Sequence, residues 1–223
     1  MNTVNRKSVL AFAAGSLATA SIAMLIAAGP EHKDHDHADH ANHADKVTQP
    51  EMDEMLEMST EDMMAAMAVL ATPGEHHKAL EKTVGTWTAK TSFVMDPTAP
   101  PTEGVGTMTT EWVLGKRFTK SVFKTNFMGD DFEGLAYAGY DIAHEEYVST
   151  WMDTMSTKIT SMTGQIDKDG TMTMKGMATT PMGDNPMKMV TTWQSDDQWT
   201  DQFYDLMPDG SWFNSATIVY TRN

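Results

Sequence analysis

From Val84 to the C-terminus, apolar and polar residues alternate with a period of two. In the first such segment the apolar side carries Trp87, Ala89, Thr91, Phe93 and Met95. Turn-forming residues separate the segments at Asp96-Pro97, Leu114-Gly115, Gly129-Asp130, Lys168-Asp169-Gly170, Gly183-Asp184-Asn185 and Pro208-Asp209-Gly210. Alternation interrupted by such turns predicts about ten strands of roughly eight to twelve residues.

The short connections favour a meander, in which strands that follow one another in sequence pair in space. An open sheet of this length would expose two unpaired edges and one apolar face, and closure removes both. We therefore predict an all-β domain over residues 84–223, an antiparallel up-and-down β-barrel. Its Met- and Trp-rich interior suits either a filled core or a pocket for one small ligand.

Two short helices are expected before the barrel, within a Met-rich segment over residues 51–83. Ser59 or Thr60 can cap the first helix, and Thr72-Pro73-Gly74 ends it. A second helix fits Glu75–Thr83. Upstream, Met52, Met55 and Met58 recur every third residue, which suits either Cu(I) ligation or packing by a flexible side chain.

The first 29 residues have the pattern of an export signal. Arg6 and Lys7 precede an uncharged, weakly hydrophobic run from Ser8 to Ala28, and small residues stand at Ala27 and Gly29. This favours a cleaved signal peptide over a retained N-terminal membrane anchor. In either case we expect the remainder to be exported: periplasmic, extracellular, or held outside the inner membrane. The membrane is then a partner only through an uncleaved N-terminal segment.

Residues 30–50 form a linker rich in His and Asp, without large apolar residues in its His-bearing part, and we expect it to be disordered. Its imidazoles could chelate Zn or Cu, or the tract could be a solvated spacer. The metal-ligand candidates are His32, His35, His37, His40 and His43.

Composition and motifs exclude several kinds of partner and site. The net charge of −15 disfavours nucleic acid as a partner. The absence of cysteine excludes disulfides, thiolate metal sites and a Cys nucleophile. The chain also lacks a Ser/His/Asp spacing, a Gly-rich phosphate loop and an HExxH motif, so no catalytic residue is assigned.

Several segments carry a family resemblance: TPGEHHKALEKTVGTW (72–87), WVLGKRF (112–118), FMGDDFEGLAYAGYD (127–141), YVSTWMDTM (147–155) and the closing YTRN (220–223). Together, from about Thr72 to the C-terminus, they resemble the bacterial family DUF1579. The resemblance implies a lipocalin-like barrel and supplies no catalytic or binding residues. The stretch Gly85-Thr86-Trp87 is also similar to the start of lipocalin-type barrels, which implies a structural cation–π pair between Trp87 and Arg222.

The leading functional hypothesis is a non-enzymatic module that binds a small, mostly apolar molecule inside the barrel. The alternatives are metal buffering through the His tract and the Met-rich helix, and an enzyme on the barrel. Asp153 shares a strand face with Trp151 and would contact ligand if that face points inward, or water if it points outward. The ligand-binding candidates are Trp112, Tyr140, Trp151, Asp153, Met174 and Met189.

Overall fold

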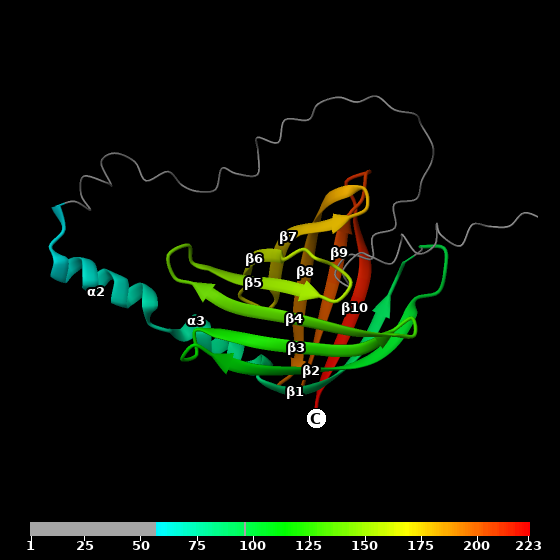
Figure 1. The fold of residues 1–223 in the computed structure, drawn as a ribbon, viewed down its shortest axis with the longest axis horizontal. Coiled ribbons are helices and arrows are strands. Elements are labelled where there is room, and N and C mark those ends of the chain that lie inside the picture. Colours follow the sequence, from blue (N-terminus) through cyan, green and yellow to red (C-terminus); the bar gives the residue numbers. More distant parts are fainter. Residues whose placement is uncertain (1–56, 96) are drawn as a thin grey trace, which may run out of the picture. The chain divides into compact units, whose positions relative to one another are not determined.

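The computed structural model describes residues 57–95 and 97–223 (Figure 1). The predicted export signal, the His tract and the upstream residues Met52 and Met55 lie outside the described residues. The chain divides into two units, with a boundary in the sequence between Thr72 and Pro73, and each unit is described by itself.

The Met-rich segment contains helix α2, Thr60–Ala71. The hydroxyl of Ser59 caps it by accepting a hydrogen bond from the Asp62 amide at 3.1 Å, and Glu61 and Asp62 place negative charge in the first turn. At the other end the Thr72 hydroxyl donates to the Ala68 carbonyl at 2.6 Å. No helix in the described part of the chain combines the length and apolar character needed to span a bilayer.

The second unit begins with α3 (Glu75–Ala79) and the 3-10 helix η1 (Leu80–Thr83), in the place where one helix was predicted. The strands follow as β1 (Gly85–Phe93), β2 (Thr102–Val113), β3 (Phe118–Phe127), β4 (Asp130–Asp141), β5 (Glu146–Asp153), β6 (Thr160–Ile166), β7 (Met172–Thr180), β8 (Gly183–Ser195), β9 (Gln198–Leu206) and β10 (Trp212–Arg222).

The ten strands form a closed antiparallel barrel in which each strand pairs with its sequence neighbours (Figure 1). Closure occurs between β1 and β10, where Trp87 pairs with Arg222 and Phe93 with Ala216. The predicted up-and-down barrel is therefore confirmed. No strand of the closed ring keeps an unpaired edge, which removes the main route to edge-to-edge aggregation.

Two apolar clusters fill much of the barrel. The first surrounds Trp87 and includes Phe93, Phe123 and Trp199. The second is rich in methionine and contains Leu80, Tyr147, Met162, Met174 and Met187. The period-two prediction holds along β1, where Trp87, Ala89, Thr91 and Phe93 are all buried.

Leu114 departs from the alternation. Continued from Met108 and Thr110, the period of two would put it on the inward face, but 72% of it is exposed, in agreement with the turn predicted at Leu114-Gly115. The reason is local, because the strand has ended at Val113 and Leu114 enters the β2–β3 turn with a φ of 50°. A residue in that left-handed turn conformation no longer follows the pleat of the strand.

Candidate ligand-binding cavity

The barrel encloses a cavity of about 200 Å³. Every strand contributes to its wall, and Ala79, Leu80 and Thr83 line it from α3 and η1. Apolar side chains dominate the wall, among them Phe123, Met162, Met174, Met189, Trp193 and Phe203. An engineered apolar cavity of about 150 Å³ accepts benzene, whereas pockets for drug-sized ligands span roughly 300–1,000 Å³. The volume therefore suits a small molecule of one or two rings.

The closed end of the barrel is the region where Arg222 lies over Trp87, with its guanidinium carbon 3.9 Å from the ring centre. The same guanidinium donates to the carbonyls of Val84 at 2.9 Å and Lys82 at 3.1 Å, and to Asp197 Oδ1 at 3.0 Å. The Trp87 indole N–H donates to the Thr83 carbonyl at 2.8 Å. This is the pair that the resemblance implies, and these contacts give both side chains a structural role.

Asp201 is the charged residue of the cavity wall. It lies on β9 between Trp199 and Phe203 on the same strand face, and 9% of it is exposed. The Thr191 hydroxyl, from the paired position on β8, donates to Asp201 Oδ1 at 2.5 Å. Burial raises the pKa of Asp201 to about 6, although hydrogen bonds from Thr191 and Trp199 act in the opposite direction.

Tyr220 reaches the same part of the wall from β10, with its ring stacked on Trp199 at a centroid distance of 4.4 Å. Burial raises the pKa of the Tyr220 phenol well above its ordinary value, and the negative charge of Asp201 adds to this effect. The phenol is therefore neutral at any physiological pH. A carboxyl, a hydroxyl and a phenol thus meet in one aromatic corner of the cavity.

Ser149, on β5, supplies another polar group to the wall. Its Oγ is buried and has no hydrogen-bond partner among the described residues. A buried hydroxyl left without a partner costs about 1–3 kcal/mol. This group can donate to, or accept from, a molecule inside the cavity.

Three of the six predicted ligand-binding residues line the cavity: Trp151, Met174 and Met189. Trp151 is held firmly, because its indole N–H donates to Asp153 Oδ2 at 2.7 Å and a Cβ at Gly134 would overlap its ring. Gly134 thus leaves the space in which the indole lies.

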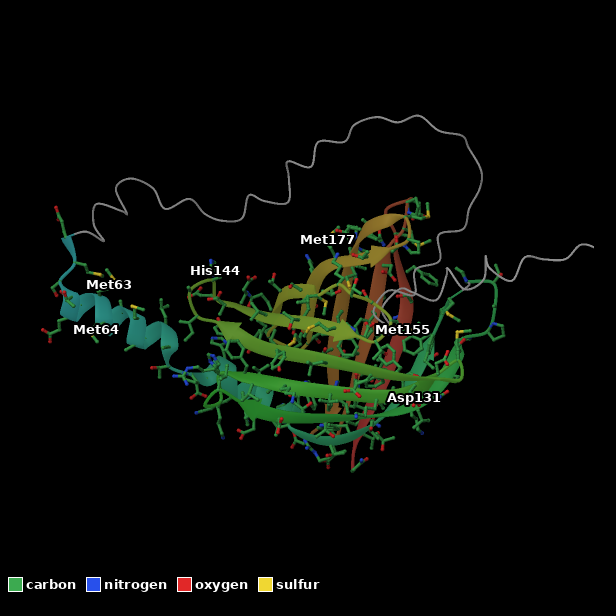
Figure 2. All side chains as sticks on the ribbon, in the orientation of Figure 1. Met63, Met64, Asp131, His144, Met155 and Met177 are labelled. Carbon is green, nitrogen blue, oxygen red and sulfur yellow. The ribbon has the colours of Figure 1, made fainter. Side chains whose placement is uncertain are left out.

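Asp153 is absent from the cavity lining. Its second oxygen accepts from the amide of Met155, labelled in Figure 2, at 2.9 Å. The carboxylate ends β5 and binds its own strand and the following turn. It orients Trp151 and does not itself face the cavity.

Trp112 and Tyr140 also lie outside the lining, at the end of the barrel near α3. Tyr140 stacks on His76 with ring centroids 4.2 Å apart, and Trp112 packs against the methionine-rich cluster. Both point inward by alternation, but they stand at strand ends, where His76 of α3 covers Tyr140. The five candidate His ligands of the tract lie outside the described residues. Within the described ranges, no group of three or more His, Cys, Asp or Glu residues is placed to hold a metal ion.

Sequence reasoning missed Asp201, Thr191 and Tyr220. Strand β9 reads Gln-Trp-Thr-Asp-Gln-Phe-Tyr-Asp-Leu, with polar and aromatic residues on both faces, so the inward face cannot be chosen from the pattern. Only the contact between Trp199 and Trp87 could have indicated the inward face of β9. Asp201 follows Trp199 by two residues and therefore lies on that same face.

Comparison with known proteins adds the family. The sequence profile described as "Protein of unknown function (DUF1579)" matches residues 72–222. The chain belongs to this family. The match spans α3, η1 and nearly the whole barrel, so the cavity is a feature of the DUF1579 part of the chain.

Two solved structures are similar to this DUF1579 chain. The crystal structure of Rv2717c from M. tuberculosis has 13% identity and a TM-score of 0.49, and the match covers 68% of this chain and 99% of that one. The S-type phycobiliprotein lyase CPES from Guillardia theta has 9% identity and a TM-score of 0.49, with 70% and 96% covered. No curated protein matches the chain.

Proposed function

We propose that this DUF1579 barrel is a non-enzymatic binding module that holds one small, mostly apolar molecule in its interior. The observation that carries the proposal is the cavity of about 200 Å³ inside the closed barrel, walled by Met, Phe and Trp side chains. Methionine supports this use because its flexible thioether adapts to the shape of a guest. A few polar groups in an apolar wall are typical of sites that orient a ligand.

A cavity-filling variant provides the test. Ala138 lines the cavity on β4, so Ala138→Phe fills part of the space. Ala143→Phe adds the same side chain in the exposed β4–β5 turn and is the matched control. Small molecules extracted from the purified full chain are identified by mass spectrometry, and binding of naphthalen-2-ylmethanol is measured by calorimetry.

We expect a co-purified molecule, or saturable binding of the probe with one site per chain, in the wild type and in Ala143→Phe. Ala138→Phe should lose at least about tenfold in affinity while keeping its β-sheet circular dichroism, because the added ring occupies the ligand's volume. Equal binding by Ala138→Phe would place the ligand elsewhere. No co-purified molecule and no probe binding in the wild type would contradict the proposal.

Export is part of the proposal. The order of residues 1–29, basic, then apolar, then small, supports a carrier that works outside the inner membrane. The His/Asp-rich segment would then lie between the export signal and the barrel. Cell fractionation of the full chain, with the N-terminal residue of the mature form determined by mass spectrometry, tests this. Recovery of uncleaved chain in the cytoplasm would contradict it.

A further inference from the structure

The cavity wall is charged at one side chain only. Among the described residues that line it there is no Lys, Arg, His or Glu, and Asp201 is the sole acid. Nor does Asp201 form an ion pair with any basic group in the described ranges. Burying a carboxylate without a cation is costly, and natural cores rarely keep one without a use for it.

The partners that Asp201 does have leave acceptor capacity unused. Thr191 Oγ1 donates one hydrogen bond to Oδ1, and Trp199 donates another. A carboxylate has about four lone-pair sites, so two donors from the wall do not saturate it. Because Asp201 lines the cavity, a molecule inside it can supply the missing donor.

Aromatic rings stand beside this carboxyl. Trp199 stacks on Tyr220 at 4.4 Å and lies 4.8 Å from Trp193, and all three residues line the cavity. The faces of indole and phenol rings attract organic cations. The net charge of −15 adds a long-range attraction for cations over the whole chain.

We infer that the ligand is a small apolar amine whose protonated nitrogen binds the Asp201 carboxylate beside Trp193, Trp199 and Tyr220, while its apolar body fills the methionine-lined part of the cavity. This inference rests on the proposed binding function and deepens it. The same wall rejects carboxylate-bearing lipids, because it offers their anion no basic partner and places an acid beside it.

Three probes with one apolar body test the inference: naphthalen-2-ylmethylamine, which is cationic, naphthalen-2-ylmethanol, which is neutral, and 2-naphthoate, which is anionic. Their affinities for the full chain are compared by calorimetry at pH 8. Asp201→Asn keeps the size and the acceptor for Thr191 but removes the charge. Asp131→Asn, on the exposed face of β4 and labelled in Figure 2, makes the same charge change away from the cavity.

We expect the amine to bind about 10- to 100-fold more tightly than the alcohol, the range of a charge-assisted hydrogen bond, and the naphthoate to bind most weakly. Asp201→Asn should remove the preference for the amine while leaving the affinity for the alcohol within about threefold. Asp131→Asn should leave the preference intact. The comparison of the three probes on the wild type gives a result even if a variant fails to fold.

The two possible failures are distinct. If the alcohol or the naphthoate binds as tightly as the amine, or if Asp201→Asn retains the preference, the amine inference is overturned and the binding module stands. If none of the three probes binds to the wild type, the amine inference is overturned, and if no small molecule co-purifies with the chain either, the proposed function is overturned as well.

Discussion

The closed end of the barrel and the Asp201 corner of the cavity each hold a charged side chain against tryptophan, but the surrounding residues satisfy these two charges differently. At the closed end, the Arg222 guanidinium donates hydrogen bonds to one carboxylate and three backbone carbonyls and lies over the Trp87 ring, so the fold itself supplies partners for its charge. Asp201 has two hydrogen-bond donors and no cation from the described residues. The contrast separates a group whose charge the fold satisfies from one whose remaining acceptor capacity, on our inference, a ligand uses.

Trp87→Ala is expected to produce the largest effect, because it empties the centre of the closed end. Trp87 is fully buried and contacts Trp199, Trp193 and Arg222. The free energy of unfolding should fall by about 3–5 kcal/mol, as for other buried aromatic truncations. Urea denaturation measures this, with the half-exposed Trp212→Ala as control. A loss below about 1 kcal/mol would contradict the structural role.

Arg222→Met should come next. The substitution keeps an unbranched side chain but removes the cation and leaves the Val84 and Lys82 carbonyls without their donor. We expect a loss of about 2–3 kcal/mol in the free energy of unfolding. Arg222→Lys should restore little of it, since an ammonium cannot reproduce the planar fork. Arg117→Met, which removes one exposed hydrogen bond to the Leu114 carbonyl, is the matched control.

Asp201→Asn should change stability in the opposite direction. The folded-state pKa of about 6 lies above the ordinary value of 3.8, so the folded protein binds this proton more tightly than the unfolded chain does. The cost of the buried charge is therefore absent below about pH 4, grows as the pH rises through about 6, and persists above it. At pH 7 the ligand-free variant should be more stable than wild type by on the order of 3 kcal/mol.

The measurement for Asp201→Asn is urea denaturation at pH 4, 6 and 8. The gain should appear between pH 4 and 8, whereas Asp131→Asn should change little at any pH, since its side chain is exposed. A destabilising Asp201→Asn at pH 8 would show that the carboxylate serves the fold, as Arg222 does, and would remove the contrast between the two regions.

Ser149→Ala should have the smallest effect. Its hydroxyl is buried in the wall without a partner among the described residues, so removing it deletes an unsatisfied group and opens little space. The free energy of unfolding should change by less than about 1 kcal/mol, in either direction. Thr191→Val removes the donor to Asp201 and should cost more. Equal and large losses in both would mean that Ser149 has a structural partner after all.

Much of the fold could be predicted from sequence because a half-buried strand leaves a direct signal. The alternation around Trp87 and the turn residues at Gly170 and Gly210 are local properties, and they predicted ten strands and their closure. The Ser59 cap was equally local. Leu114 failed because a turn conformation, and not the strand pattern, decides its direction.

The site was less predictable, because a residue lines the cavity only if it faces inward and also lies at the right height along the barrel axis. Trp112 and Tyr140 point inward near the α3 end, where other side chains cover them. Asp153 follows Trp151 by two residues on β5, and its carboxylate accepts the hydrogen bond of the Trp151 indole. Asp201 gave no signal, since β9 carries polar residues on both faces. Its surroundings come from residues on β8 and β10, which only the folded barrel brings beside it.

The central claim is that the barrel interior is a binding site with Asp201 as its anchor. A crystal structure of the full chain with naphthalen-2-ylmethylamine tests it most directly. We predict the naphthalene ring among Met174, Met189 and Trp193, and the nitrogen within hydrogen-bond distance, about 2.7–3.2 Å, of an Asp201 carboxylate oxygen. A ligand on the outer surface, or an amine directed away from Asp201, would contradict the claim.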